Sequence, residues 1–350
     1  MTPLTSFEPS RNQRNVALLV GDGLDACAAP GVADSLRRHG SKVLAVLSEA
    51  ARDLLRPEAM RLAGAQVLGQ PEEIPAGTPA LLCPGDQAAQ GLAARRIEPG
   101  RTASLGPGVV DDLPQFAHND VAEAARWLLS PRSLAGRTVL ITAGPTAEDL
   151  DPVRFLTNRS SGRMGVALAA ASTCLGARTL LVHGPLAVPC PALPGLFATP
   201  VRSAREMHSA VHERVAECDA AILCAAVADF APRETAVQKI KKTGCDELTL
   251  ALARTPDILA SLGALARRPF LVGFAAETQD LAHYAQGKLH RKNCDAICAN
   301  DVSAPDSGFG VETNRITVFR RDAPPLVFPL LGKREAAEQI LLLVAQALDA

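Results

Sequence analysis

Residues 138–175 read TVLITAGPTAEDLDPVRFLTNRSSGRMGVALAAASTCL, and this stretch decides the fold. It opens with a short apolar run, Thr138–Thr142, which predicts a buried strand. An alanine-rich helix is predicted over Gly162–Leu175, after a loop of polar and small residues. A second apolar run, Thr179–His183, follows the helix, so these elements predict a parallel βαβ unit.

The same alternation continues to the end of the chain. It predicts helices over Ala204–Glu217, Leu281–Lys292 and Lys333–Leu348, and strands over Ala220–Ala225, Phe270–Phe274, Ala296–Ala299 and Arg315–Phe319. This order is typical of the α/β class, and it predicts a Rossmann-like, doubly wound, mainly parallel sheet over residues 137–350.

A smaller flavodoxin-like or flavoprotein-like α/β domain is predicted over residues 15–130. A loose tail at 1–14 precedes it, and a linker at 131–136 follows it. The expected strands are Asn15–Val20, Lys42–Leu47 and Ala80–Cys83, and the expected helices end near Gly40 or cover Ala50–Ala63 and Val121–Leu129.

Composition limits the classes of function. The 350 residues are 47% hydrophobic with a net charge of −1, which favours a globular protein and disfavours nucleic-acid binding. We find no secretory signal at the start and no apolar run of about 18 residues, so we expect a cytoplasmic protein with no membrane partner. The nine cysteines lack a disulfide framework, and Cys294 and Cys298 are expected to be buried thiols.

The loop before the first helix of the large domain has the character of an anion site. Ser160 or Ser161 is a good N-cap, and free N–H groups at a helix start favour a phosphate. Arg159 and Arg163 add positive charge. Taken singly, these features also fit a capped helix after an ordinary loop. The turn Gly21-Asp22-Gly23 lacks the third glycine of a dinucleotide fingerprint, and a Walker sequence is absent, which disfavours a nicotinamide dehydrogenase.

Further polar clusters follow later strands. Asp229 stands where the strand at Ala220–Ala225 should end, and Lys239-Ile240-Lys241-Lys242 fits a solvated face and a triphosphate-binding loop about equally well. His208 and His212 have helical metal-ligand spacing, but without a third ligand they are better explained as surface or packing histidines.

Six ordered motifs give the chain a resemblance to a known family. They read ITAGPTAEDLDPVRFLTNRSSGRMG, AAVADF, KIKK, PDIL, GFAAET and RKNCDAICANDVS. In this order over residues 137–350 they resemble the phosphopantothenate–cysteine ligase portion of the bifunctional coenzyme A biosynthesis proteins, the Dfp flavoproteins. The resemblance implies that CTP activates 4′-phosphopantothenate as an acyl-cytidylate, and that the amine of L-cysteine then displaces CMP.

The resemblance also implies roles for individual residues. Asn158 is expected to act on the acyl-cytidylate with Arg154 nearby and Ala226 shaping the site, and Lys239 is expected to assist the first half-reaction. Contacts to CTP are implied for Asp229, Phe274, Lys288, Lys292, Pro256, Asp257, Ile258 and Leu259, and contacts to its triphosphate for Ser160, Ser161 and Gly162. Triphosphate chemistry implies Mg²⁺, for which no protein ligand is assigned. The family pattern suggests a homodimer. Thr255 and Arg163 replace the usual Asn and Lys.

The front domain follows the flavoprotein pattern less closely. Asn15–Met60 resembles the start of the family's flavin-dependent decarboxylase domain, but His39 and His118 lie in the wrong surroundings for its catalytic histidine. Residues 82–89 replace the flavin loop. We therefore expect a shortened domain without FMN. The alternatives are a bifunctional enzyme that also decarboxylates phosphopantothenoylcysteine with FMN, and a non-enzymatic nucleotide sensor or scaffold.

Overall fold

The computed structural model describes residues 15–21, 27–38, 41–76, 78–83, 97–105, 115–116, 121–241, 247–277, 281–301, 308, 311–321 and 323–350. The predicted tail at 1–14, Asp22-Gly23 of the glycine turn, His39, His118, Lys242 and most of the 82–89 segment lie outside these residues. The chain divides into two compact units, residues 1–131 and 132–350. Within the described residues, no helix has the length and apolar character needed to cross a membrane.

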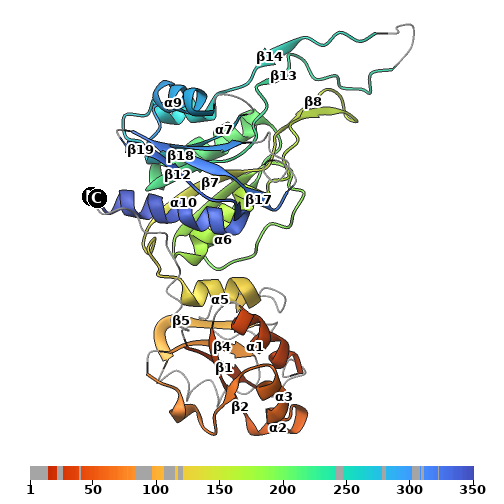
Figure 1. Ribbon diagram of the computed structural model, residues 1–350. Coiled ribbons are helices and arrows are strands. Elements are labelled where there is room, and N and C mark those ends of the chain that lie inside the picture. Colours follow the sequence, from red (N-terminus) through yellow and green to blue (C-terminus); the bar gives the residue numbers. More distant parts are fainter. Residues whose placement is uncertain are drawn as a thin grey trace. The chain divides into compact units, whose positions relative to one another are not determined.

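The smaller unit contains a parallel six-stranded sheet with the order β3-β2-β1-β4-β5-β6 (Figure 1). The strands are β1 (Asn15–Val20), β2 (Lys42–Leu47), β3 (Gln66–Val67), β4 (Thr78–Cys83), β5 (Ile97–Leu105) and β6 (Gln115–Phe116). The helices are α1 (Ala29–Arg38), α2 (Glu49–Leu54), α3 (Pro57–Leu62), the 3-10 turn η2 (Pro71–Glu73) and α5 (Val121–Leu129). The two-residue β3 adds an outer strand to the β2-β1-β4-β5-β6 order of a flavodoxin-like sheet.

The single helix predicted over Ala50–Ala63 is wrong, because the chain breaks between α2 and α3. Pro57 occupies the first turn of α3, and Arg56 before it is extended at φ −67° and ψ 136°. Proline lacks an N–H and disfavours helical backbone in the residue before it, so it begins a new helix instead of continuing α2.

The larger unit is built on an eight-stranded sheet with the order β11-β10-β7-β12-β15-β16-β18-β19. Its first six strands are parallel, and β18 and β19 are antiparallel additions. They are β7 (Thr138–Ala143), β10 (Arg178–His183), β11 (Leu196–Pro200), β12 (Ala220–Leu223), β15 (Phe270–Glu277), β16 (Ala296–Asp301), β18 (Ile316–Arg320) and β19 (Ala323–Val327). This order confirms the predicted doubly wound sheet of Rossmann type.

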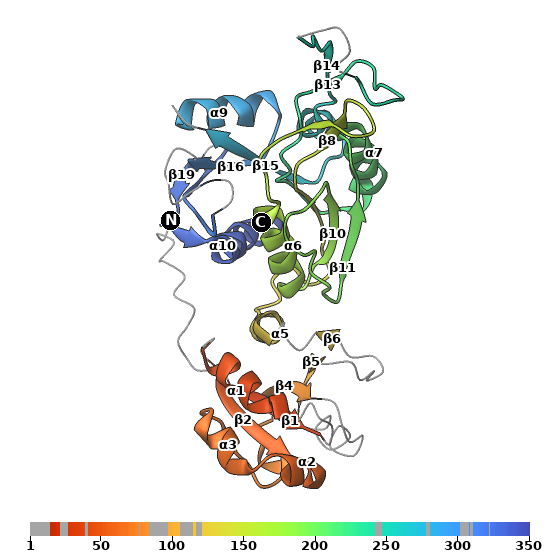
Figure 2. The same ribbon diagram turned by 90° about the vertical axis from the view of Figure 1, so that its right-hand side faces the viewer.

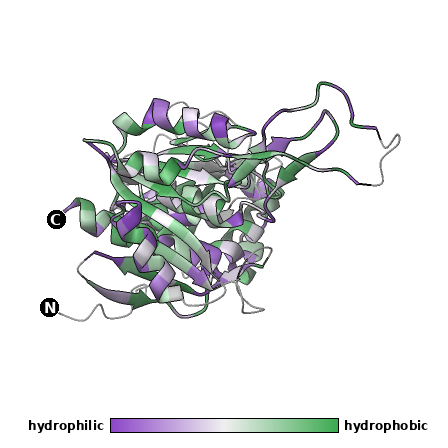
Figure 3. Ribbon diagram, turned by 90° about the horizontal axis from the view of Figure 1, so that it is seen from above, coloured by the Kyte–Doolittle hydropathy of each residue, from purple (hydrophilic) through white to green (hydrophobic). Residues whose placement is uncertain are grey.

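Helices cover both faces of this sheet (Figures 1 and 2). Those on one face are α6 (Arg163–Cys174) and α10 (Lys333–Leu348), and those on the other are α7 (Ala204–Arg214), followed by η3 (Val215–Glu217), α8 (Ile258–Gly263) and α9 (Leu281–Arg291). The two faces bury separate clusters: Leu168 and Ile340 pack in the first, and Met207 and Leu289 in the second. Figure 3 shows the strands of the sheet mostly in green, the colour of hydrophobic residues.

Two hairpins project from the sheet, and we call their described residues, 147–157, 230–241 and 247–254, together the arm (Figure 1). Its strands are β8 (Ala147–Asp149) with β9 (Phe155–Thr157), and β13 (Phe230–Pro232) with β14 (Leu252–Arg254). A further short pair, β17 (Thr313–Asn314) with β20 (Leu331–Gly332), precedes α10. The sequence predicted none of these hairpins.

Gly165 allows α6 to pack closely on β7. A Cβ at this position would lie 2.8 Å from Cα of Ala143 and 3.1 Å from the carbonyl oxygen of Thr142. The first turn of α6 therefore approaches the end of β7 more closely than a side chain allows. This contact sets the position of the loop that leads into α6.

We expect Gly165→Ala to lower the free energy of unfolding of the larger unit by about 2 kcal/mol, because the added methyl overpacks a rigid contact. Gly287→Ala is the matched control, since nothing lies within 4 Å of a Cβ at this position in α9. It should stabilise by up to about 1 kcal/mol. Urea unfolding measures both variants, and equal stability of the two would contradict the close packing.

Candidate active site

The site lies where β7 and β12 are neighbours but their connections run to opposite halves of the sheet. This is the switch point at which doubly wound sheets bind ligands beyond the carboxyl ends of their strands. The two strands remain paired past their ends, through a bridge between Pro145 and Ala226 and a 2.9 Å hydrogen bond from Ala226 N to Gly144 O. The Thr142 hydroxyl also accepts a hydrogen bond from Ala225 N at 3.1 Å.

Asn158 is fixed at this junction by its side-chain amide. Its Nδ2 donates to the carbonyl oxygens of Ala226 at 3.0 Å and Val227 at 3.1 Å. The preceding residue, Thr157, donates to the carbonyl oxygen of Thr146 at 2.8 Å. Among the described residues, no donor binds Asn158 Oδ1. The two carbonyls therefore define which way the amide faces, and its oxygen remains available to a ligand.

The loop before α6 adopts a different cap from the predicted one. Gly162, not Ser160 or Ser161, is the N-cap residue, and it has a left-handed backbone with φ 79°. Ser160 Oγ accepts from Gly162 N at 3.3 Å, so its hydroxyl stabilises the loop before the helix. Ser161 and Ser160 therefore lie one and two positions before the cap. A side chain at position 162 would be strained and would lie 3.3 Å from Gly144 Cα.

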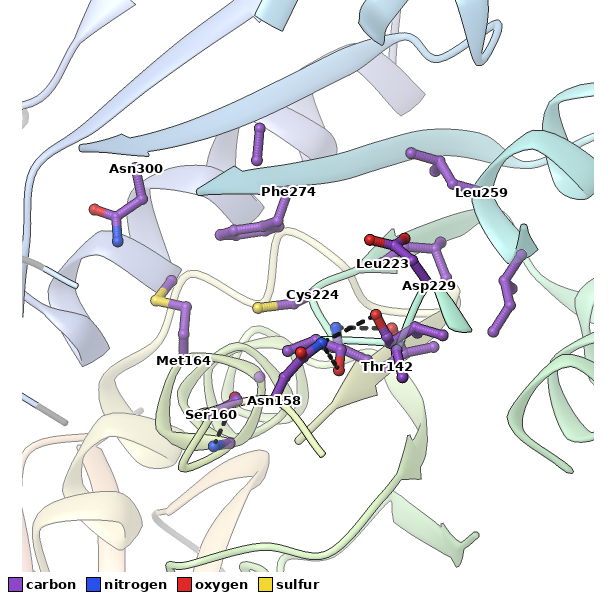
Figure 4. A pocket seen from close by; sticks show the side chains of 18 of the residues that line it. Thr142, Asn158, Ser160, Met164, Leu223, Cys224, Asp229, Leu259, Phe274 and Asn300 are labelled. Atoms are coloured by element: carbon purple, nitrogen blue, oxygen red, sulfur yellow. Dashed lines mark hydrogen bonds between the residues drawn. The ribbon is translucent and has the colours of Figure 1, made fainter. Parts of the chain in front are cut away.

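A cavity of about 820 Å³ opens at this junction, within the range of small-molecule sites (Figure 4). Most of the residues singled out from the sequence line it: Asn158, Ser160, Ser161, Gly162, Ala226, Asp229, Pro256, Asp257, Ile258, Leu259, Phe274, Lys288 and Lys292. Figure 4 shows Asn158 and Ser160 opposite Phe274, with Met164 and Asn300 toward one end and Asp229 and Leu259 toward the other.

The end of the cavity near α8 and α9 carries both charge and apolar surface. Asp257 caps α8 by accepting from Ala260 N at 2.9 Å, and its carboxylate also forms an ion pair with Lys292. Burial raises the pKa of the Asp257 carboxyl, but hydrogen bonds from Lys292 and Ala260 N outweigh it and hold that pKa below its usual value. Lys288 Nζ donates to the carbonyl oxygen of Phe274 at 2.6 Å, which fixes the stem of this lysine along the wall.

The opposite end contains two cations that start helices. Lys333 opens α10, is only 7% exposed, and donates to the carbonyl oxygens of Gly308 and Val311. Burial, followed by the nearby charge of Arg163, lowers the pKa of the Lys333 amine. Arg163 opens α6 and pairs with the exposed Glu312. Cations at helix N-termini oppose the helix dipole, so two of them beside one cavity indicate a place for negative charge.

The sequence motifs did not single out Lys333, Thr142, Cys224 or Asn314, which also line the cavity. A lysine at the first position of a helix was the available signal for Lys333, because it opposes the dipole. Thr142 lies within the first motif but was assigned no role, and Cys224, which is half-buried, and Asn314, which is buried, show no distinguishing pattern. Burial raises the pKa of the Cys224 thiol to about 12, so Cys224 is a neutral part of the wall.

Arg154 and Lys239 do not line this cavity. Both belong to the arm, where Arg154 forms an ion pair with Asp151, and Lys239 is exposed. The structure therefore brings Asn158 and Ala226 together at the junction and leaves the other two predicted catalytic residues outside it.

Two sets of residues outside the cavity have ordinary structural environments. Cys294 and Cys298 are buried free thiols, as predicted, and burial raises the pKa of Cys294 to about 11. The rings of His208 and His212 lie 4.3 Å apart, and His212 Nε2 is 2.8 Å from Ser261 Oγ. Within the described part of the chain, no group of three or more His, Cys, Asp or Glu side chains is arranged to hold a metal ion.

The sheet order and the cavity at its switch point define a Rossmann-like α/β protein with a small-molecule site. Residues 134–348 match the family described as the DNA/pantothenate metabolism flavoprotein C-terminal domain. The chain belongs to this family, which confirms the resemblance inferred from the sequence motifs.

Similarity to individual proteins agrees with the family match. The chain is 48% identical over 243 residues to the coenzyme A biosynthesis bifunctional protein CoaBC of Vibrio cholerae, covering 69% of this chain and 59% of that protein. It is 42% identical over 250 residues to a cysteine/cysteine sulfinic acid decarboxylase of an unknown prokaryotic organism, covering 70% and 69%. The crystal structure of the C-terminal domain of CoaBC superposes with a TM-score of 0.53 at 39% identity, covering 62% of this chain and 98% of that one.

Proposed function

We propose that the chain is a CTP-dependent ligase that joins 4′-phosphopantothenate to L-cysteine and gives 4′-phosphopantothenoylcysteine, CMP and pyrophosphate, a step of coenzyme A biosynthesis. The observation that carries the proposal is the orientation of Asn158 at the switch point, beside the α6 N-terminus. A plain anion-binding scaffold would not need a cavity-lining amide whose nitrogen is fixed by two backbone carbonyls. The family match and the CoaBC relatives support the substrate class.

In the first half-reaction, a carboxylate oxygen of phosphopantothenate attacks the α-phosphorus of CTP, and pyrophosphate leaves. The protein has to align two anions and stabilise charge on the departing phosphates. The N–H groups around Gly162 and the cations Arg163, Lys288 and Lys333 are suited to this task, because all of these residues line one cavity.

The lining residues also fit a Mg²⁺ that enters with the triphosphate. This ion commonly binds substrate phosphates together with one or two carboxylates. Among the described lining residues, Asp229 is a carboxylate without an ion pair, whereas Asp257 is paired with Lys292. We assign Asp229 to the metal–nucleotide complex, in which Mg²⁺ would neutralise phosphate charge.

In the second half-reaction, the amine of cysteine attacks the acyl carbonyl, the bond from that carbon to the CMP oxygen breaks, and the amine loses a proton. The oxygen of Asn158 can accept a hydrogen bond from the incoming amine and direct its lone pair toward the carbonyl. Because Ala226 and Val227 hold the amide nitrogen, this orientation exists before the substrate arrives.

We further propose a homodimer in which the arm of one copy completes the cavity of the other. This arrangement would bring Arg154 and Lys239 to a cavity that they do not line in their own chain. Apolar side chains exposed on the arm support it, since clustered exposed apolar residues mark interfaces. They are Val153, Phe155, Phe230, Val237, Leu248, Leu250 and Leu252.

The test of the proposed function is a complete reaction with purified protein. We expect CMP and 4′-phosphopantothenoylcysteine from CTP, Mg²⁺, phosphopantothenate and cysteine, and a lower rate when ATP replaces CTP. Omitting phosphopantothenate should abolish pyrophosphate release. If the full mixture yields no CMP, the ligase proposal is wrong.

A second candidate is a bifunctional enzyme that also decarboxylates phosphopantothenoylcysteine with FMN. The similarity of the chain to a cysteine/cysteine sulfinic acid decarboxylase is the observation that favours this second candidate. We propose that the front unit lacks FMN, because residues 82–89 replace the flavin loop of the family pattern. An absorbance scan of the purified protein distinguishes the two, since bound FMN is yellow, and a flavin spectrum would favour the bifunctional enzyme.

A further inference from the structure

Asp151 is a buried carboxylate at the turn between β8 and β9, and it is only 1% exposed. One of its oxygens, Oδ1, accepts hydrogen bonds from Val153 N at 2.8 Å and Arg154 N at 2.9 Å. The other, Oδ2, accepts from both Nε and Nη2 of the Arg154 guanidinium, at 3.0 and 2.5 Å. Asp151 therefore fixes the backbone of the turn and the direction of Arg154 together.

The same carboxylate reaches the second hairpin of the arm. Asp151 Oδ2 also accepts from Ile240 N at 3.0 Å, and Arg154 Nη2 donates to the carbonyl oxygen of Ile240 at 2.8 Å. Ile240 is thus held on both its N–H and its C=O, and it lies between Lys239 and Lys241. A further bond, from Ala236 N to the carbonyl oxygen of Leu150 at 3.0 Å, joins the two hairpins nearby.

We propose that Asp151 is a positioning residue for nucleotide activation, which clamps Arg154 and the Lys239 loop into one unit that meets the triphosphate. This inference rests on the proposed function. Its physical basis is that Arg154 and Lys239 carry the same charge and belong to loops far apart in the sequence. The buried Asp151 carboxylate pairs with Arg154 and binds the backbone N–H of Ile240 beside Lys239. It therefore fixes both loops before the substrate binds, so less ordering entropy is lost in the reaction.

Hydrogen bonds from Arg154, aided by those from three backbone N–H groups, hold the pKa of the Asp151 carboxyl far below its usual value. The Asp151 carboxylate therefore stays ionised across the pH range in which enzymes work. Asp151→Asn keeps the shape of the side chain but removes its charge and one acceptor oxygen, so it cannot satisfy Arg154, Ile240 and the turn at once.

The experiment compares Asp151→Asn with Asp149→Asn in the full chain. Asp149 lies on the same hairpin and forms an ion pair with Arg202, but its side chain makes no hydrogen bond with the described residues of the Lys239 loop. With CTP, Mg²⁺ and phosphopantothenate, we expect Asp151→Asn to lower kcat for pyrophosphate release by about 30-fold, mainly without raising KM for CTP, and Asp149→Asn to change it by less than about twofold.

A double-mutant cycle separates positioning from general destabilisation. If Asp151 acts through Lys239, Asp151→Asn combined with Lys239→Gln should be no slower than Lys239→Gln alone, within about twofold. Hydrogen exchange of the Ile240 amide should also be faster in Asp151→Asn than in Asp149→Asn, because that amide loses its partner. If the losses of rate in Asp151→Asn and Lys239→Gln multiply in the double variant, the clamp is overturned. Equal activity of the two aspartate variants would overturn it as well.

Failure of the clamp and failure of the proposed function give different observations. A wild-type protein that releases no pyrophosphate overturns the proposed function, and the activation role of the clamp with it. A wild-type protein that is active, with Asp151→Asn equal to Asp149→Asn, overturns the clamp alone.

Discussion

Replacing Asn158 by alanine is expected to leave pyrophosphate release largely intact and to slow amide formation by about 10³-fold, because one preorganised polar contact to the reacting group is lost. The variant also frees the carbonyl oxygens of Ala226 and Val227 from the amide. Both residues line the cavity, where water can replace the amide, so we expect the fold to persist. Single-turnover reactions that follow pyrophosphate and product separately measure the two steps.

Thr157→Val is the matched control for this variant. It removes the neighbouring hydrogen bond to the carbonyl oxygen of Thr146 without changing the size of the side chain. If Thr157→Val slows amide formation as much as Asn158→Ala, the effect comes from disorder of the loop. Equal loss of pyrophosphate release and amide formation in Asn158→Ala would contradict its assignment to the second step.

Lys239→Gln is expected to have the opposite signature. Pyrophosphate release should slow by about 10²-fold or more, because the variant loses the cation that the proposed function assigns to the leaving phosphates. Lys241→Gln removes the same charge two residues away and should have a much smaller effect. Initial rates of pyrophosphate release at saturating CTP make the comparison. Similar losses in both variants would show that only the net charge of the loop matters.

Mixing the Asn158→Ala and Lys239→Gln variants, both of which should form the amide product slowly, tests where the arm acts. In a twofold dimer whose arms are exchanged, a hybrid of the two chains has one site with both changes and one site with neither. After unfolding and refolding of an equal mixture, about a quarter of the wild-type rate of amide formation should return, since half of the dimers are hybrids. No recovery would mean that each arm serves its own cavity.

Nine of the sheet strands were predictable because they are short apolar runs with small or polar residues at their ends, whereas β3, β5, β6, β11 and β19 were not predicted. The predicted and observed bounds coincide for β1 and β2, and they differ by one residue for β7 and β10. Burial on both faces makes such strands continuously apolar, which is a strong local signal. The same signal located the loop of Asn158, because polar residues there interrupt two apolar elements.

The arm was not predictable in this way. Its strands have only three residues each, which is too few to show a hydrophobic alternation, and only in β8 are most of these residues buried. The contacts of Asp151 with Ile240 join residues 89 positions apart, and a local pattern cannot reveal such a pairing. Motifs therefore identified Arg154 and Lys239 as residues of interest, whereas the structure was needed to place them outside the cavity of their own chain.

The fate of the carboxylate oxygen tests the central claim most directly. Phosphopantothenate labelled with ¹⁸O in its carboxylate is converted with CTP and cysteine, and the nucleotide product is analysed by mass spectrometry. An acyl-cytidylate transfers one labelled oxygen to CMP, because the oxygen that attacked the α-phosphorus leaves with it. Unlabelled nucleotide, with the label instead in inorganic phosphate beside CDP, would show activation at the γ-phosphate and would contradict the account.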